Sequence, residues 1–284
     1  MYDVIIIGNG PAGLSAALYV LRANRSVLIV GKDDGSLKNA GKIENYFGMQ
    51  SRISGKELIE AGKKQVLELG AELINEEVMD IKKEEFFTIN TKSKEYFSKV
   101  VIMATGTTKK TLRIKGLKDL EGKGVSYCAV CDAFFYRNKD VAVLGSGEYA
   151  LHELKHIIPI AKSVSVLTNG MKIKTVFPPD ICVINEHIKE LQGKDKLKSV
   201  IFDNGNSIDL NGLFIAVGSA TSVDLARKIG AVINKDKIVV DENMETSVPE
   251  LFAAGDCTGG IQQISVAVGE GAKAGLSAIR YFAE

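Results

Sequence analysis

The 284-residue sequence lacks any apolar run approaching the roughly 18 residues that a membrane-spanning helix needs. It also lacks a surplus of charge, because 36 Lys and Arg residues against 35 Asp and Glu residues give a formal net charge of +1. This balance offers no electrostatic case for binding nucleic acid or an anionic membrane. The short basic cluster of Lys109, Lys110, Arg113 and Lys115 is typical of a solvated loop. We therefore expect a globular protein without nucleic-acid or membrane partners.

We also expect no signal peptide, because residues 2–7 (Y-D-V-I-I-I) enter a predicted strand at once. A cytoplasmic protein is the simplest expectation. Cysteine is scarce, with four residues in the chain: Cys128, Cys131, Cys182 and Cys257. Structural disulfides are rare in a reducing compartment, so a close pair there is more often catalytic or metal-binding.

A nucleotide-binding pattern opens the chain. Residues 4–7 form an apolar strand, residues 8–13 spell G-N-G-P-A-G, helical spacing of apolar residues follows, and residues 26–30 form a second strand. A strand, a G-x-G-x-x-G turn, a helix and a strand within about thirty residues indicate a dinucleotide site.

The three glycines of this turn have separate physical tasks. Gly8 permits the tight turn, Gly10 lets the backbone approach a pyrophosphate, and Gly13 lets the helix pack closely on the strand. The N-terminus of the helix then offers free N–H groups and its positive dipole end to the phosphates.

One element of the pattern is missing after the second strand. An acidic residue is expected there to bind the ribose, but Val30 leads to Gly31 and Lys32. Asp33 or Asp34 is the alternative ribose ligand.

The same pattern recurs in the middle of the chain. Residues 140–144 form a strand, residues 145–150 (G-S-G-E-Y-A) the turn, and residues 163–167 the next strand. Short strands that end in glycine, at 100–103 and 213–217, lead to the carboxyl edge of a sheet, where ligands bind. Two βαβ units predict an α/β protein of two Rossmann-like domains, each doubly wound in three layers.

A C-x-x-C pair lies between the two halves. One turn brings Cys128 and Cys131 within disulfide distance, which favours a redox-active pair. Half of a zinc site is the alternative, but zinc needs a second pair of ligands. Cys182 and Cys257 are isolated, and His152, His156 and His187 are not spaced as a ligand pair for them, so no metal site is expected.

The other candidate residues near this pair have two interpretations. Asp132, beside Cys131, could manage a proton for the thiolate or a reduced flavin, or it could simply cap a helix. We favour the functional role. Cys182 and Cys257 are isolated in sequence and are expected to be small buried apolar residues.

With these motifs the chain resembles the low-molecular-weight thioredoxin reductase family, nearly end to end. Residues 126–136 (S-Y-C-A-V-C-D-A-F-F-Y) resemble the specific S-Y-C-A-T-C-D-G-F-F-Y signature of that family. Residues 43–48 resemble its V-E-N-[WFY]-P-G segment, with Phe47 where proline is usual. Residues 104–106 match its A-T-G motif, and residues 252–256 resemble its second FAD motif.

The resemblance implies a homodimer whose FAD domain is discontinuous, at residues 1–114 and 243–284. A central redox domain of pyridine-nucleotide type would occupy residues 115–242. Cys131 would face the flavin, and Cys128 would attack the disulfide of thioredoxin or a thioredoxin-like protein. A mixed disulfide of this kind resolves when the second thiolate attacks it.

The resemblance also names FAD as the cofactor. Its implied contacts are Gly8, Gly10, Pro11, Ala12, Gly13, Asn45, Ala104, Thr105, Gly106, Gly255, Asp256, Gln263 and Ile264.

The chain departs from the family where NADPH would bind. After the strand at 163–167 the family has an H-R-R-x-x-x-R stretch, whereas residues 167–172 read L-T-N-G-M-K, with neither a basic pair nor an acid. Only residues 171–180 separate that strand from the next, where the family usually has a helix. Residues 216–221 lack the proline and asparagine of the family, and Gly35-Ser36 replaces its G-G-Q segment.

These departures resemble the ferredoxin-dependent flavin thioredoxin reductases, in which an iron–sulfur protein feeds the flavin single electrons. Three alternatives stay open. An ordinary NADPH-dependent enzyme would hold the nucleotide at Gly145, Gly147 and Ala150. A dithiol oxidase would pass electrons from a small dithiol through flavin to oxygen. A flavin-binding redox sensor would leave the C-x-x-C pair without a purpose.

Overall fold

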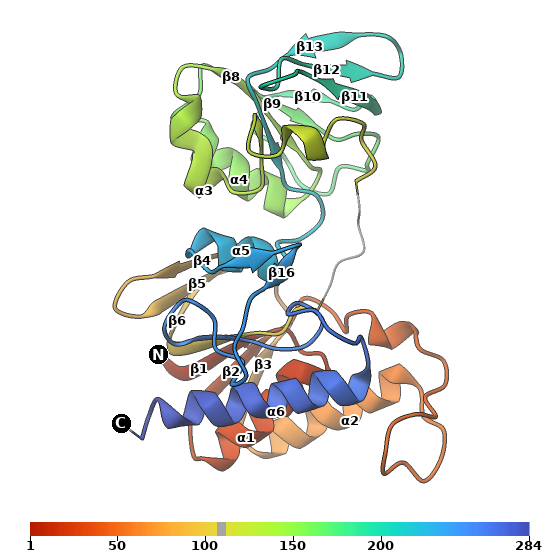
Figure 1. Cartoon of the computed structure of the whole chain (residues 1–284), viewed down its shortest axis with the longest axis vertical. Coiled ribbons are helices and arrows are strands. Elements are labelled where there is room, and N and C mark those ends of the chain that lie inside the picture. The colour runs from red at the N-terminus through yellow and green to blue at the C-terminus, as the bar shows by residue number, and fades with distance from the viewer. Residues whose placement is uncertain (107–111, 284) are drawn as a thin grey trace. The chain divides into compact units, whose positions relative to one another are not determined.

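The computed structural model describes residues 1–106 and 112–283, and the chain divides into two compact units (Figure 1). The first unit comprises Met1–Thr108 and Thr221–Glu284, and the second comprises Lys109–Ala220. Lys109 and Lys110 of the predicted basic cluster lie outside the described residues.

The second boundary between the compact units lies at 220/221, whereas the family resemblance implies a domain boundary at 242/243. The difference arises because α5 (Ser222–Lys228) packs on the first unit. Lys228 Nζ lies 3.2 Å from Asp80 Oδ1 on β4 (Val78–Lys83), with both side chains buried. Ser222 also hydrogen-bonds Thr105, so the returning chain joins this unit at once.

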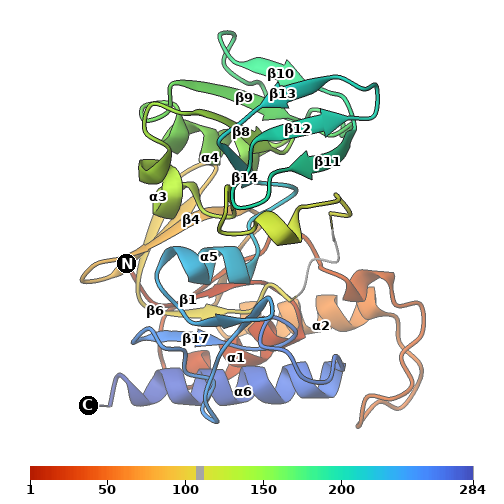
Figure 2. The ribbon, with the colours of Figure 1, turned by 45° about the horizontal axis from the view of Figure 1, so that its top comes forward.

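The first unit contains a seven-stranded sheet in the order β3-β2-β1-β6-β5-β4, with β17 also paired to β6. Neighbours among β1, β2, β3, β6 and β17 run parallel, and β4, β5 and β6 form an antiparallel meander. Helices α1, α2 and α6 lie along one face of the sheet (Figure 2). The remaining bounds are β1 (Tyr2–Ile7), β2 (Val27–Val30), β3 (Glu72–Ile74), β5 (Phe87–Thr91), β6 (Glu95–Met103), β15 (Ile233–Asn234), β16 (Lys237–Ile238), β17 (Leu251–Ala253), α1 (Pro11–Arg22), α2 (Gly55–Glu68), α6 (Ile264–Arg280) and the 3₁₀ helix η1 (Leu37–Asn39).

The core of this unit forms where the central strands meet the helices. Val4, Ile6 and Ile29 on adjacent strands are fully buried together with alanines of α1 and α6. Strands buried on both faces read as continuous apolar runs, which explains the V-I-I-I and V-L-I-V segments. Ser15 Oγ on α1 donates to the Val268 carbonyl on α6 at 2.8 Å, so the two helices are also linked by a hydrogen bond.

The second unit contains a five-stranded parallel sheet in the order β10-β9-β8-β14-β7 and a three-stranded antiparallel sheet of β11, β12 and β13. Helix α4 follows β8 and packs against it, in the βαβ arrangement that the sequence predicts. Its bounds are β7 (Val125–Ser126), β8 (Asp140–Leu144), β9 (Ser163–Leu167), β10 (Cys182–Ile184), β11 (Ile188–Gln192), β12 (Ser199–Phe202), β13 (Ser207–Asp209), β14 (Gly212–Ile215), α3 (Ala129–Asp132), α4 (Glu148–Ile157), η2 (Lys118–Leu120) and η3 (Ala133–Tyr136).

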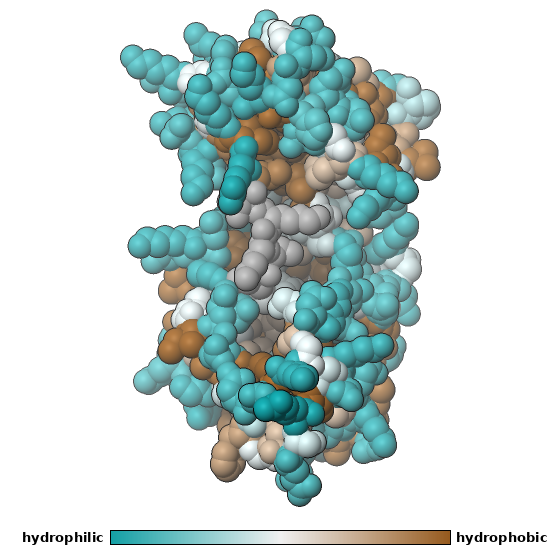
Figure 3. Space-filling model, turned by 90° about the vertical axis from the view of Figure 1, so that its right-hand side faces the viewer, coloured by the Kyte–Doolittle hydropathy of each residue, from teal (hydrophilic) through white to brown (hydrophobic). Residues whose placement is uncertain are grey.

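The α/β class with two Rossmann-like units, one of them built from two separate chain segments, is confirmed. Hydrophilic side chains dominate the face in Figure 3, with apolar atoms set between them, as expected of a chain with 25% charged residues. Within the described residues, no helix combines the length and apolarity that a membrane crossing requires.

Candidate functional site

The first glycine turn joins β1 to α1, and packing alone requires two of its glycines. Gly8 has φ +118°, and a Cβ there would lie 2.2 Å from the Ala104 carbonyl oxygen. A Cβ on Gly13 would lie 1.9 Å from the Gly8 carbonyl oxygen. A Cβ on Gly10 would meet no atom within 4 Å, so the space beside Gly10 is open to a ligand.

The N-terminus of α1 is arranged to receive an anion. Gly10 is its N-cap and Pro11 its first residue, and no side chain of the described protein caps this end. The free N–H groups and the dipole of the helix therefore remain available to a phosphate. The turn fits the pyrophosphate of a dinucleotide such as FAD, since the backbone approaches where Gly10 has no side chain.

Other predicted cofactor residues meet this turn at one edge of the sheet. Ile7 on β1 pairs with Met103 on β6, and Met103 pairs with Ala253 on β17, all in parallel register. The residues that follow these three strands therefore share the carboxyl edge, where ligands of parallel sheets bind. Consistent with this, the Ala254 N–H donates to the Met103 carbonyl at 2.9 Å. The structure thus brings Gly8–Gly13, Ala104–Gly106 and Gly255–Asp256 together.

Asn45 and Gln263, also predicted to contact the cofactor, lie together. The Asn45 amide donates to Gln263 Oε1 at 3.0 Å, and Ile264 is the first residue of α6. The loop that carries Asp256 is held by a residue that no sequence motif indicates. Glu270 Oε2 on α6 accepts from the Gly255 N–H at 2.7 Å, but no spacing in the sequence signals this contact.

A cavity of about 320 Å³ lies beyond the ends of β2 and β3, where the sequence predicts a ribose ligand. Asp33 and Asp34 both line it, so either position stays open to a ribose hydroxyl. Burial alone would raise the pKa of Asp33, but the Gly35 N–H and the Lys38 ammonium lower it. The other lining residues, most of which lie outside the sequence motifs, are Asn9, Lys32, Lys38, Lys63, Leu73 and Asn75.

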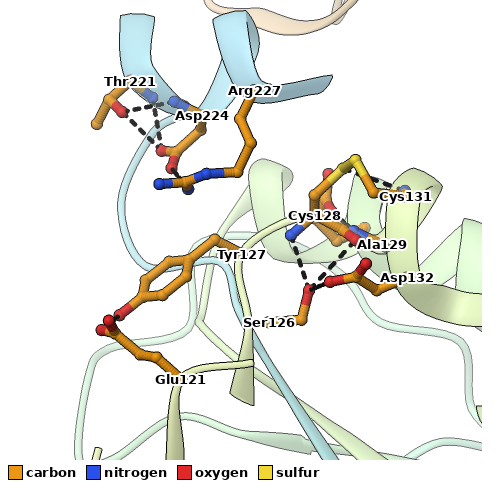
Figure 4. Close-up of polar contacts among 11 residues, drawn as sticks. Glu121, Ser126, Tyr127, Cys128, Ala129, Cys131, Asp132, Thr221, Asp224 and Arg227 are labelled. Atoms are coloured by element: carbon orange, nitrogen blue, oxygen red, sulfur yellow. Dashed lines mark hydrogen bonds and ion pairs between the residues drawn. A yellow bond between two sulfur atoms is a disulfide. The ribbon is translucent and has the colours of Figure 1, made fainter. Parts of the chain in front are cut away.

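The predicted dithiol is present as a Cys128–Cys131 disulfide with Cα atoms 5.3 Å apart. Cys128 is the N-cap of the short helix α3, and its Sγ accepts from the Cys131 N–H at 3.1 Å (Figure 4). A helix N-terminus stabilises a thiolate at this position. The two sulfurs bond each other, as a redox pair requires, instead of standing apart as metal ligands.

Asp132 belongs to a hydrogen-bonded network under this disulfide (Figure 4). Ser126 Oγ donates to Asp132 Oδ2 at 2.7 Å and accepts from the Cys128 N–H at 3.1 Å. The Asp132 side chain makes no capping bond to the following 3₁₀ helix η3. Burial, followed by the charge of Asp132, raises the pKa of Tyr136. Ser126 thus connects the carboxylate to the backbone of Cys128.

The two sulfurs differ in exposure. Cys128 is buried, whereas Cys131 is exposed. Three large apolar side chains near Cys131 are also exposed: Val130 (48%), Phe134 (66%) and Phe135 (67%). We call these three residues the apolar rim of the dithiol; such a surface on a monomer is typical of a protein-binding site.

The two isolated cysteines have different environments. Cys257 is buried as expected, and burial raises the pKa of its thiol to about 12. The expectation of burial is wrong for Cys182, which is exposed. Cys182 lies on β10, an outermost strand of its sheet, where side chains find fewer neighbours than in the centre.

In the second glycine turn, as in the first, packing requires the first glycine, but here a loop lies across the turn. A Cβ on Gly145 would lie 2.2 Å from the Ala216 carbonyl oxygen, so packing requires this glycine whether or not a nucleotide binds. The Lys174 N–H donates to the Ser146 carbonyl at 2.7 Å, and Thr175 Oγ1 donates to Glu148 Oε1 at 2.8 Å. Residues 171–180, where the family usually has a helix, contain none.

Comparisons with known proteins agree with this geometry. A family model described as pyridine nucleotide-disulphide oxidoreductase matches residues 2–271. A thioredoxin reductase from Aquifex aeolicus is 35% identical, over 99% of this chain and 93% of that protein.

Two solved structures are also similar. The atypical thioredoxin reductase TRi from Desulfovibrio vulgaris Hildenborough is 38% identical with a TM-score of 0.94, over 100% of this chain and 98% of that one. A ferredoxin-flavin thioredoxin reductase from Clostridium acetobutylicum is 31% identical with a TM-score of 0.75, over 99% and 98%.

Members of the matched family are FAD-binding flavoproteins, and the glycine turn at the N-terminus of α1 fits that cofactor. The disulfide between Cys128 and Cys131 fits the redox-active dithiol of such enzymes. With matches that span almost its whole length, the chain belongs to the thioredoxin reductases within the pyridine nucleotide-disulphide oxidoreductase family.

Proposed function

We propose that this thioredoxin reductase receives its electrons from a reduced iron–sulfur protein of the ferredoxin type and not from NADPH. The observation that carries the proposal is the loop after β9, which crosses the second glycine turn through the contacts of Lys174 and Thr175. In a nucleotide-binding unit this turn must stay open to the pyrophosphate.

The residues directly after β9 support the same proposal. A 2′-phosphate requires Arg or Lys there, and a 2′-hydroxyl requires Asp or Glu. The chain has Thr168 and Asn169 instead, and both side chains are engaged inside the unit. Thr168 Oγ1 donates to Asn185, and Asn169 Oδ1 accepts from the Ile188 N–H at 2.6 Å.

When bound, FAD would supply electron transfer, because a flavin can accept single electrons and deliver a pair. The dithiol would then act on thioredoxin. The Cys128 thiolate attacks one sulfur of the thioredoxin disulfide, and the other thioredoxin sulfur leaves as a thiolate. The Cys131 thiolate next attacks Cys128 Sγ, which restores the Cys128–Cys131 disulfide and releases reduced thioredoxin.

Asp132 would handle the protons of this cycle. Its carboxylate lies within the network that includes the Cys128 N–H and Ser126, so it is placed to accept a thiol proton as the thiolate forms. Because Cys128 is buried, the proposed roles require a rearrangement that exposes its sulfur before thioredoxin reacts.

The apolar rim would receive the acceptor protein. Phe134 and Phe135 are each about two-thirds exposed, and aromatic side chains dominate the binding energy of many interfaces. We also expect a cytoplasmic homodimer, whose mass in light scattering should be twice the 30.6 kDa of one chain.

The test is an anaerobic titration of the purified holoenzyme, in which flavin absorbance is followed with NADPH, with NADH and then with reduced ferredoxin. Bleaching by ferredoxin alone, followed by thioredoxin reduction, is the expected result. Prompt bleaching by NADPH would overturn the proposal and favour an NADPH-dependent enzyme. One observation supports that second candidate, because a Cβ on Gly147 would meet no atom within 4 Å.

A further inference from the structure

Glu153 is a buried carboxylate that neither the sequence motifs nor the proposed chemistry uses. It lies on α4, the helix that follows the second glycine turn, and only 1% of the residue is exposed. Its Oε2 accepts a hydrogen bond from the Ala129 N–H at 2.8 Å. A carboxylate is costly to bury unless its oxygens accept hydrogen bonds, so this contact helps to keep Glu153 inside.

Ala129 is the first residue of α3, the helix that carries the dithiol. The N–H groups in the first turn of a helix have no partner within the helix and must be satisfied from outside. In α3, Glu153 satisfies the N–H of Ala129, and Cys128 Sγ satisfies that of Cys131. These contacts anchor the backbone between the two cysteines, whose Cα atoms lie 5.3 Å apart.

We propose that Glu153 is a positioning residue for the dithiol, which holds the start of α3 where the two sulfurs favour the disulfide. Helix α4 then has a task in this chain whether or not a nucleotide binds at its N-terminus. The proposal rests on the proposed function only in taking Cys128 and Cys131 as the working dithiol.

Two conservative variants distinguish the effect of the length of the Glu153 side chain from the effect of its charge. Glu153→Gln keeps an acceptor oxygen at the same reach without the charge, and Glu153→Asp keeps the charge on a shorter side chain. Lys155→Gln, an exposed position on the same helix, is the matched control. The anaerobic holoenzyme of each variant is equilibrated in glutathione redox buffers, and its free thiols are alkylated and counted by mass spectrometry.

We expect Glu153→Gln and Lys155→Gln to match the wild type within about twofold. In Glu153→Asp the Ala129 N–H loses its acceptor, so the disulfide should be easier to reduce by about five- to tenfold in the equilibrium constant. A tenfold change corresponds to about 30 mV in the potential of this two-electron couple.

Two outcomes would overturn the proposal. A Glu153→Asp potential equal to that of the wild type would mean that the contact does not position the dithiol. A Glu153→Gln shift as large as that of Glu153→Asp would mean that an acceptor oxygen at the right reach does not suffice, which contradicts a purely positional role.

Amide hydrogen exchange gives a second readout, with faster exchange at Ala129 expected in Glu153→Asp only. Uniformly faster exchange would instead indicate a loosened fold and would count against positioning. Neither measurement involves ferredoxin or thioredoxin, so the proposed function can fail without affecting them.

Discussion

At the scale of single residues, Gly10 is needed for cofactor binding and not for packing. Its Cβ position is empty, whereas that of Gly13 is occupied by the Gly8 carbonyl. Two glycines of one motif therefore serve different ends, and substitution distinguishes them.

We predict that Gly10→Val folds but is purified without flavin, because the valine side chain occupies the place of the pyrophosphate. Gly13→Val, the matched control, should instead destabilise the protein by about 3 kcal/mol or more, because its side chain collides with backbone. Flavin absorbance and circular dichroism check both expectations. A Gly10→Val protein that stays yellow would contradict the placement of FAD.

The two sulfurs are the next pair of residues with separable roles. Cys128→Ser should lower thioredoxin reduction by more than about 10³-fold, because the attacking nucleophile is lost. It should leave a Cys131 thiolate near the flavin, visible as a long-wavelength charge-transfer band. If Cys131→Ser gave that band instead, the two assignments would be reversed.

The isolated cysteines should differ in reactivity. Burial raises the pKa of Cys257 to about 12, so at pH 8 its thiol is protonated as well as inaccessible. Cys182 is exposed and should be alkylated first in the native oxidised protein, with Cys257 reacting only after denaturation. Because the raised pKa favours the protonated folded form, this thiol should stabilise the fold fully near neutral pH and lose that effect as the pH rises toward 12. Mass spectrometry of the alkylated peptides is the measurement, and early labelling of Cys257 would contradict its burial.

At the scale of elements, α5 is tied to the A-T-G motif at the point where the chain returns to the first unit. Thr221 and Asp224 form a capping box at its start, visible in Figure 4. Ser222 Oγ lies 2.7 Å from Thr105 Oγ1, and the Thr105 N–H donates to the same Ser222 Oγ at 3.2 Å. A seven-residue helix depends on such contacts, because its own hydrogen bonds are few.

We predict that Ser222→Ala destabilises the protein by about 1 kcal/mol, since the hydrogen bonds between the buried Ser222 hydroxyl and Thr105 are lost. Denaturant unfolding of the holoenzyme measures this change. Thr221→Ser, which keeps a capping hydroxyl, is the control and should stay close to the wild type. Equal stability of Ser222→Ala and wild type would show that the link contributes little.

At the scale of the whole molecule, the division of the chain sets which pieces can fold alone. The first unit includes Thr221–Glu284, and so contains α5 as well as the residues after 242. The hydrogen bonds between Thr105 and Ser222 bring the two ends of this unit close together.

A chain in which residue 106 is joined to residue 221 by a short Gly-Ser linker should therefore fold and retain flavin. A chain that lacks residues 115–242, cut at the boundaries predicted from sequence, should not, because α5, β15 and β16 are lost. Bound flavin and a single unfolding transition are the readouts. A yellow, cooperative protein from the second deletion would show that α5 is dispensable.

Much of this protein follows from local sequence. The two glycine turns, the apolar strands beside them and the C-x-x-C pair are short-range patterns, and the strands at 4–7, 140–144 and 163–167 appear where the sequence predicts them. Each is recognisable because turn, helix and strand chemistry depends on neighbours in the chain.

Only the tertiary structure decided the contacts between distant segments. The return of the chain at 221, the loop across the second turn, the exposure of Cys182 and the Glu153 carboxylate on Ala129 have no local signal. These features arise because elements far apart in sequence pack together. Whether a hydrogen bond forms, or a strand lies at the edge of its sheet, depends on the order of all the strands. The sequence thus determined the kind of redox chemistry, and the fold decided how its groups are held.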